Sequence, residues 1–165
     1  MREIPMPEMI DERTTEVSGI AADPTVGSMT SPAARLLPAL DDDSREFWTA
    51  GASGVLRLPF CASCVRWNFP PSLRCQSCEG TAEYRTLSGK GRVFTYTVNH
   101  HPFNPEVPVP YLIAIVELVE QDGLRFTTNV VNCSPENIAI GMGVRVLFEK
   151  QGDVFVPIFE PDSED

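Results

Sequence analysis

The chain has 165 residues, 42% of them hydrophobic, and a formal net charge of -10 at pH 7. This length and apolar content suffice for the core of one ordinary domain or of two small ones. The acidic balance argues against a nucleic-acid-binding protein, because affinity for nucleic acid rests on Lys and Arg side chains that neutralise phosphates.

No apolar run approaches the ~18 residues that cross a bilayer, and the N-terminus lacks the pattern of a signal peptide. We therefore expect a cytoplasmic protein that binds no membrane. Cytosolic thiols are kept reduced, so paired cysteines in such a chain favour metal ligation over structural disulfides.

The first 54 residues fall into two segments. Residues 1–40 carry five prolines and no sustained hydrophobic period, which predicts a segment that is disordered or that orders against a partner. Residues 41–54 predict a short helix, with acidic residues at its start and Gly51 at its end. Phe47 and Trp48 would anchor this helix, either by docking on another protein or by packing on its own domain.

Residues 55–87 predict a small metal-binding ribbon. Alternating apolar residues over 55–60 and 66–71 predict a hairpin around the first cysteine pair, and residues 79–87 predict a further strand. The cysteines follow the spacing C-x2-C, ten residues, C-x2-C, which offers four thiolates to one tetrahedral ion. A closed set of this kind is structural, and the predicted ligands are Cys61, Cys64, Cys75 and Cys78.

Three other features of the cysteine pairs bear on this prediction. A thioredoxin-type redox motif needs one pair at the start of a helix, whereas both pairs here lie between β segments. Zn²⁺ is the expected ion, and iron in a rubredoxin-type site is the alternative. Glycine often follows the second cysteine of such a turn, but here Val65 follows Cys64, and Gly80 comes one residue late after Cys78.

Residues 88–161 predict a five-stranded OB-fold barrel, so the fold class is mainly β. Between the third and fourth strands, residues 134–143 leave room for one helical turn. Residues 162–165 form an acidic tail. The five runs rich in β-branched and aromatic residues are 91–101, 110–120, 124–133, 144–150 and 153–160.

No catalytic motif accompanies these elements. Cys133 is unpaired, and His100 and His101 end the first barrel strand, so a Cys–His dyad can be imagined. A lone cysteine in an apolar strand is more often a small core residue. The residues by themselves therefore indicate a binding or scaffolding module.

Several segments together resemble a known family. They are the Phe47–Trp48 pair, both cysteine pairs, and the runs LSGKGRVFTYTVNHHPF, VPYLIAIVEL and NVVNCSPENIAIGMGVRVLFE, distributed over residues 42–161. This pattern resembles the acyl-CoA-associated proteins that join a rubredoxin-like zinc ribbon to an OB-fold, a group long classed as a domain of unknown function.

The resemblance implies a non-catalytic subunit in a hetero-oligomer with a thiolase-like, sterol-carrier-type enzyme. Such a subunit helps to form or stabilise an acyl-CoA site, as in retro-aldolase or thiolase complexes of lipid or steroid side-chain degradation. The four cysteines are carried over as metal ligands. For the surface facing CoA or the partner, we nominate Lys90, Arg92, Tyr96, Asn99, His100, Phe103 and Tyr111.

Two alternative functions remain open from the sequence. An OB-fold with a zinc ribbon also occurs in nucleic-acid-binding proteins, although the charge of -10 opposes this function. A free-standing thioester hydrolase would use Cys133 as its nucleophile.

Overall fold

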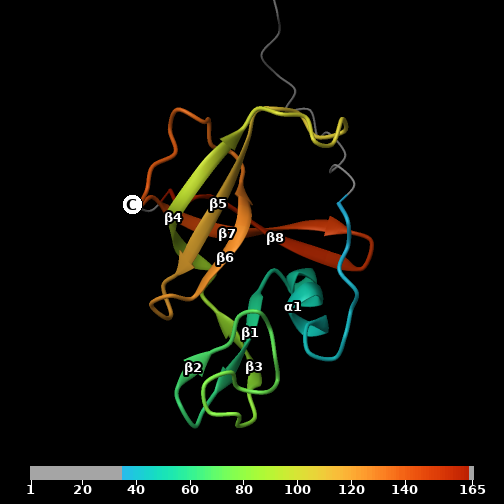
Figure 1. Ribbon diagram of the computed structural model, residues 1–165, viewed down its shortest axis with the longest axis vertical. Helices are drawn as coiled ribbons and strands as arrows, with labels where there is room; N and C mark the ends of the chain where they lie inside the picture. The colour runs from blue at the N-terminus through green and yellow to red at the C-terminus, as the bar shows by residue number, and fades with distance from the viewer. Residues whose placement is uncertain (1–34, 164–165) are drawn as a thin grey trace, which may run out of the picture.

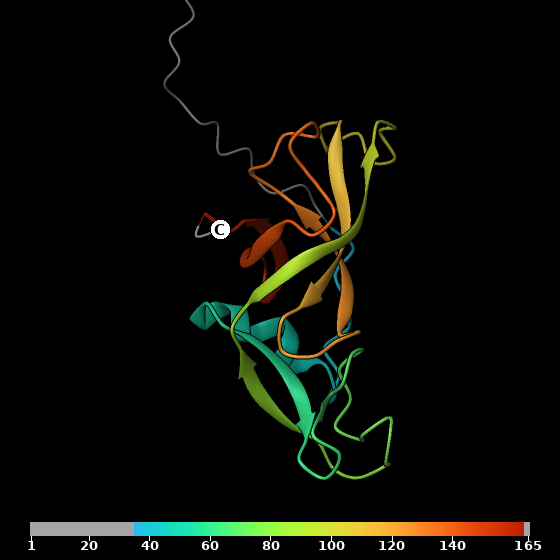
Figure 2. The ribbon, with the colours of Figure 1, turned by 90° about the vertical axis from the view of Figure 1, so that its left-hand side faces the viewer.

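A computed structural model describes residues 35–163 of the chain. In Figures 1 and 2 the sheet of the metal-binding ribbon lies below the barrel. Its three antiparallel strands are β1 (Leu56–Cys61), β2 (Arg66–Trp67) and β3 (Glu83–Leu87), in the order β2-β1-β3. The second strand is shorter than the six residues that its sequence suggested, because residues 68–71 leave the sheet at Asn68 and two prolines.

The five remaining strands close into a barrel with the order β4-β5-β6-β8-β7. This result confirms the predicted mainly β fold with a five-stranded OB-like barrel. Along β5 the residues alternate strictly between half-buried and buried, as expected for a strand with one face on a core. The strands are β4 (Lys90–Asn99), β5 (Tyr111–Leu118), β6 (Arg125–Val130), β7 (Gly143–Gln151) and β8 (Val154–Pro161).

The helix before the ribbon is shorter than predicted and continues as a 3-10 turn. It comprises α1 (Arg45–Thr49) and η1 (Ala50–Ser53). Gly51 does not end the helix, because it is buried in the 3-10 turn, where a Cβ atom would lie 2.5 Å from the side chains of Phe148 and Phe155. The chain leaves the helix at Gly54, whose φ of 70° suits glycine.

The helical turn expected between the third and fourth barrel strands is absent from residues 134–143. These residues form turns, in which the Asn137 amide donates to the Ser134 carbonyl at 2.9 Å. One proline and two glycines in ten residues oppose helix nucleation. Instead, the side chain of Ile138 is buried in the core. The helical segments α1 and η1, which come earlier in the sequence, pack against β8.

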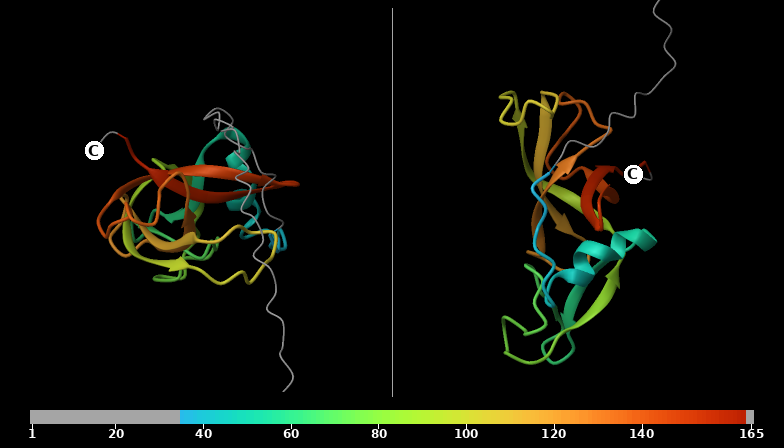
Figure 3. Two further views of the ribbon diagram at one scale, coloured as in Figure 1. Left: turned by 90° about the horizontal axis from the view of Figure 1, so that it is seen from above. Right: turned by 90° about the vertical axis from the view of Figure 1, so that its right-hand side faces the viewer.

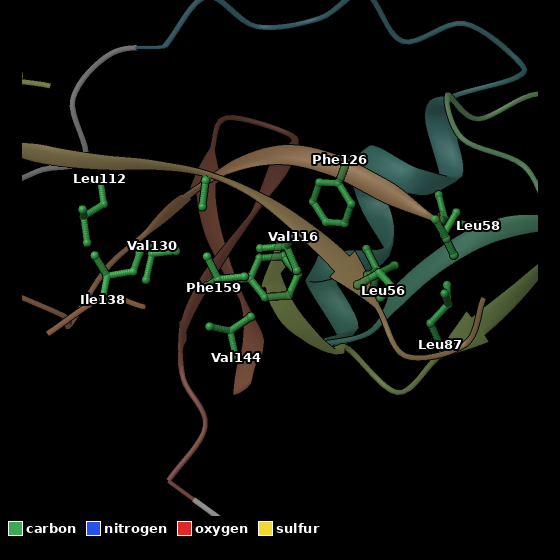
Figure 4. Packing of buried hydrophobic residues seen from close by; sticks show 14 of the residues in the cluster. Leu56, Leu58, Leu87, Leu112, Val116, Phe126, Val130, Ile138, Val144 and Phe159 are labelled. Atoms are coloured by element: carbon green, nitrogen blue, oxygen red, sulfur yellow. The ribbon is translucent and has the colours of Figure 1, made fainter. Parts of the chain in front are cut away.

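One continuous core joins the ribbon to the barrel. Leu56, Leu58 and Leu87 from the base of the ribbon share a buried cluster with the barrel residues (Figure 4). A series of edge-on and tilted ring contacts runs from the helix to the far barrel wall, with centroid separations between 4.7 and 5.9 Å. Its members in order are Trp48, Phe47, Phe69, Phe126 and Phe159.

Residues 35–40, which we call the strap, run beside the barrel towards α1 (Figure 3). Its first residue is anchored to β7, because the Arg35 guanidinium donates to both carboxylate oxygens of Glu149 at 2.8 and 3.1 Å. The strap was expected to be part of a segment that is disordered or ordered by a partner. Residues 1–34 of that segment lie outside the described residues.

Candidate metal centre and groove

The four cysteines of the ribbon come together at its tip. Their sulfur atoms all lie within 4.8 Å of one another, with 3.6 Å between Cys61 and Cys78 and 3.4 Å between Cys64 and Cys75. A disulfide would require about 2.05 Å. Sulfurs bound tetrahedrally to one ion at about 2.3 Å stand ~3.8 Å apart. The arrangement is therefore a structural metal site with four thiolate ligands.

Two similar turns present these sulfurs, and each has a residue with positive φ directly after its second cysteine. Val65 has φ 54° and Glu79 has φ 59°, a backbone conformation that glycine adopts most easily. Glycine often occupies this position, but neither turn of this chain has it there. In the second turn, the Glu79 amide donates to the Cys75 carbonyl at 3.0 Å. The chain thus adopts the knuckle geometry without glycine at either position.

Backbone amides in these turns also favour the thiolate form of two of the cysteines. Amides of Ser77 and Cys78 point at Cys75 and lower the pKa of its thiol to about 6. The Cys64 amide similarly lowers the pKa of Cys61. Each turn thus has one cysteine whose thiol pKa is lowered, which favours the thiolate form that binds a metal.

Substitution of Val65 by glycine is expected to stabilise the ribbon. A β-branched residue at positive φ is strained by roughly 1–2 kcal/mol, and Val65 is exposed, so little packing is lost. We expect V65G to raise the free energy of unfolding by about 1 kcal/mol, measured by chemical denaturation of the metal-bound protein. V119G is the matched control, because Val119 is exposed and has no positive φ, so it should show no stabilisation.

The ribbon is held to the barrel and the helix by polar contacts outside its core. The Trp67 amide donates to the Gln121 side chain at 2.8 Å across the turn between β5 and β6. The Tyr84 hydroxyl donates to the Asp43 carbonyl at 2.5 Å, and Arg57 forms an ion pair with Glu46. These contacts fix the direction in which the metal site projects from the barrel.

The residues nominated for a CoA-facing or partner-facing surface do not form one site. Lys90, which pairs with Asp162 at 3.3 Å, and Arg92 lie at the start of β4. Asn99 ends β4, nine residues after Lys90 and thus ~30 Å away. Beyond it, Phe103 is 77% exposed and contacts the His101 ring at 4.6 Å. The roles of these residues remain predictions, as does that of the exposed Tyr96 and His100.

A groove of about 1050 Å³ lies on the barrel wall formed by β5, β6 and β8. Of the nominated residues, Tyr111 and the helix pair Phe47 and Trp48 line it. Phe47 is only 3% exposed and packs within its own chain. Of the two roles that the sequence left open for this residue, packing on its own domain is therefore the correct one. Trp48 is half-buried, and its docking role remains a prediction.

Sequence reasoning missed most residues of this groove. Arg35 also donates to the Asn129 side chain at 3.0 Å. These residues are 94 positions apart, so no local sequence pattern predicts their contact. Phe69, Phe126 and Thr127 were read as parts of strands. Pro157 was the available signal, because a proline inside a strand has no amide hydrogen to donate to the neighbouring strand.

The anchor of the strap is expected to depend on acid pH. Burial opposes ionisation of Glu149, but hydrogen bonds from Arg35 and Gln151 outweigh it and lower the pKa of Glu149 below 4.5. A lowered folded-state pKa gives stability that is present above the unfolded pKa and is lost as pH falls through the folded value. The Arg35 Nε–H resonance should therefore report release of the strap only below pH 4.5.

The variant E149Q tests this assignment at neutral pH. Loss of the carboxylate should free the strap without acidification and remove the pH dependence of the Arg35 resonance. An Arg35 resonance that changes near pH 7 in the unsubstituted protein would contradict the assignment.

Cys133 lacks the surroundings of a nucleophile. Burial raises the pKa of its thiol, whereas a reactive cysteine needs a lowered one. Its sulfur contacts the Ser134 carbonyl at 3.5 Å. These observations argue against the thioester hydrolase that the sequence left open.

The chain belongs to the DUF35 family. The model of the C-terminal OB-fold domain of ChsH2 matches residues 84–149. A solved structure titled "Ltp2-ChsH2(DUF35) aldolase" superposes with a TM-score of 0.67 at 32% identity, covering 76% of this chain and 98% of that one. The comparison thus extends over the metal ribbon as well as the barrel.

Two curated relatives add to this comparison. A DUF35 domain-containing scaffold protein of Methanothermobacter thermautotrophicus is 38% identical over 54% of this chain and 68% of its own length. The 3-oxo-4,17-pregnadiene-20-carboxyl-CoA hydratase alpha subunit of Mycobacterium tuberculosis is 31% identical over 80% of this chain. This chain spans only 42% of that subunit. Among the described residues, no helix is long and apolar enough to cross a membrane.

Proposed function

We propose that this chain is a non-catalytic accessory subunit of a CoA-dependent, thiolase-like enzyme of the sterol-carrier type. It helps to form or stabilise the acyl-CoA site of a retro-aldolase or thiolase complex in the degradation of lipids or steroid side chains. The observation that carries this proposal is the match to a chain of the Ltp2-ChsH2(DUF35) aldolase over 98% of that chain. The cytoplasm is the proposed location.

The chemistry of the described residues supports a non-catalytic role. Four protein thiolates fill every position of a tetrahedral ion, so the metal offers no open position to water or substrate. Cys133 has a raised thiol pKa and contacts a backbone carbonyl rather than a base. The groove is mainly apolar and offers surface rather than reactive groups.

We propose Zn²⁺ as the resident ion, with iron as the alternative. The ion would be held by Cys61, Cys64, Cys75 and Cys78, and it would supply folding energy rather than chemistry. Elemental analysis of the purified protein distinguishes the two: one zinc per chain supports the proposal, and one iron with a visible absorption band contradicts it.

The similarity to a hydratase alpha subunit does not imply that this chain has hydratase activity. This chain spans 42% of that relative, and the other part of the relative lies outside the match. What the similarity does support is an acyl-CoA thioester, including a steroid one, as the substrate of the assembled enzyme.

Co-expression with a thiolase-like enzyme encoded beside this chain tests the proposal. The two proteins should elute together as a hetero-oligomer and remain together at 0.5 M salt. At this salt concentration the Debye length falls to roughly 3–5 Å, so surface ion pairs contribute little. Separate elution of two well-folded proteins would overturn the proposal.

A further inference from the structure

The groove on the barrel wall has the shape of a site for an elongated molecule. It follows β6 from Phe126 to Val130, four residue steps or ~13 Å of strand. At one end the ring of Phe69 lies 5.3 Å from that of Phe126, and at the other end Val130 pairs with Leu112, next to Tyr111. The volume of about 1050 Å³ is at the upper end for small-molecule sites.

The walls of this groove are apolar and already packed. The ring of Phe69 contacts Phe47 at 5.9 Å and Phe126 at 5.3 Å, so it is held in place before any ligand arrives. Four lining residues are prolines, whose rings restrict the backbone and whose nitrogen has no hydrogen to satisfy. A ligand would therefore gain apolar contacts at little cost of ordering the walls.

Most polar side chains in the groove are bonded within the chain. The Thr128 hydroxyl donates to the Pro157 carbonyl at 2.9 Å, and the amide group of Asn129 both accepts and donates a hydrogen bond. The hydroxyl groups of Tyr111 and Thr127 differ, because neither has a hydrogen-bond partner among residues 35–163. These two hydroxyls are therefore available to a ligand.

The two available hydroxyl groups belong to residues at different points along the groove. Thr127 pairs with Ile115 of β5, and Tyr111 comes four residues before Ile115, which is ~13 Å of strand. Residues opposite each other on paired strands share a face of the sheet, and so do residues four apart on one strand. The side chains of Thr127 and Tyr111 thus lie on the same face.

The charges around the groove restrict the ligand further. Its charged lining residues are Arg35, Glu106 and Glu149. Arg35 is neutralised, because its guanidinium donates to both carboxylate oxygens of Glu149 at 2.8 and 3.1 Å. Glu106 is exposed and leaves a negative charge at the rim. This balance disfavours carboxylates and the phosphates of CoA.

We propose that the groove binds an elongated, uncharged apolar molecule that has a neutral oxygen near each end. The acyl group of a steroid thioester fits this description, because it has the thioester carbonyl at one end and a ring oxygen at the other. The Tyr111 and Thr127 hydroxyls would donate to these two oxygens, and CoA would stay outside the groove. This inference rests on the proposed function and assigns to this chain a site for the acyl group.

Intrinsic tryptophan fluorescence of the metal-bound full chain tests this inference. The chain has two tryptophans, of which Trp48 lines the groove and Trp67 does not. Progesterone, a steroid with a ketone at each end, should change the fluorescence in a saturable way, and Trp48→Phe should abolish the change. Free CoA, which has no acyl group, should cause none. Absence of a saturable change with progesterone, or an equal change with CoA, would overturn the proposal.

Conservative substitutions test the two hydroxyl groups. Thr127→Val and Tyr111→Phe remove one hydroxyl each with little change of shape, and each should weaken progesterone binding ~5-fold. Thr97→Val is the matched control, because Thr97 is exposed and lies outside the groove, so affinity should stay unchanged. Equal affinity of all three variants would contradict the assigned hydrogen bonds.

Other occupants of the groove would give different results. Progesterone binding that appears only after residues 1–34 are removed would assign the groove to this chain's own N-terminal segment. Binding by the free chain that is lost in the complex would assign it to the partner's surface. A steroid acyl-CoA that fails to compete with progesterone would leave a free steroid as the ligand. Each result would overturn the acyl-group site.

These outcomes are separate from a test of the proposed function. A stable complex whose chain binds no progesterone would overturn this inference but leave the proposed function intact. Failure to form any complex would refute the proposed function, and the free chain would still report whether the groove binds progesterone.

Discussion

Removal of the metal is expected to unfold the tip of the ribbon while the barrel remains folded. The tip contains a very small buried cluster of Cys61, Cys75 and Ala82, which cannot offset the conformational entropy of residues 61–82. Structural zinc contributes about 10–16 kcal/mol in comparably small zinc-finger peptides, so its loss decides whether this part folds. The base of the ribbon differs, because Leu56, Leu58 and Leu87 belong to the core shared with the barrel.

Amide exchange after chelation at pH 7 measures this boundary directly. Amides of residues 61–82 should lose protection, whereas those paired between β4 and β5 should keep it. Cys75→Ser should reproduce the effect and lower metal content, and Cys133→Ser is the matched control that should change neither. Continued protection of the tip without metal would contradict the structural role of the ion.

Substitution of Phe47 by alanine is expected to cost about 3–5 kcal/mol of folding free energy. Its ring is 3% exposed and lies between Trp48 at 4.7 Å and Phe69 at 5.9 Å, which joins the helix to the ribbon and the barrel. The cavity left by the ring has little chance to close, because the neighbouring rings are themselves fixed by packing.

Chemical denaturation of the metal-bound protein checks this value. Because Phe47 joins the parts, F47A should also separate the unfolding of the helix from that of the barrel, seen as a lower denaturant slope. F103A is the matched control: Phe103 is 77% exposed, so its loss should change stability by less than ~0.5 kcal/mol. Equal effects of the two substitutions would contradict the position assigned to Phe47.

The parts of the fold that local patterns encode could be predicted from the sequence. The spacing of Cys61, Cys64, Cys75 and Cys78 predicted four converging sulfurs, because two tight turns can present them whatever else the chain does. The strands from Lys90 to Leu118 followed from alternation of apolar residues.

The parts that depend on distant contacts could not be predicted. Gly51 looked like a helix end, but packing of Phe148 and Phe155 against it requires glycine inside the turn. Arg35 looked like part of a disordered segment, but its carboxylate partner lies 114 residues away. The helical turn expected over residues 134–143 is replaced by turns, and α1 and η1, from earlier in the chain, pack against β8. The groove therefore became visible only in the folded chain.

These features suggest how the subunit works. A metal held by the four cysteines would fix the tip of the ribbon. The aromatic series from Trp48 to Phe159 fixes the ribbon against the barrel, and the strap is anchored beside the groove. A rigid body of this kind presents the groove and the ribbon at a constant spacing. The proposed partner would therefore gain an ordered surface next to its acyl-CoA site, without receiving a catalytic group.

The most direct test of the proposed accessory role is turnover of an acyl-CoA thioester by three preparations: the metal-bound chain alone, the thiolase-like enzyme alone, and the two together. The account predicts no turnover by the chain alone and at least tenfold faster turnover by the pair than by the enzyme alone, a gain of about 1.4 kcal/mol in transition-state stabilisation. Turnover by the isolated chain, or equal rates for the enzyme with and without it, would contradict the account.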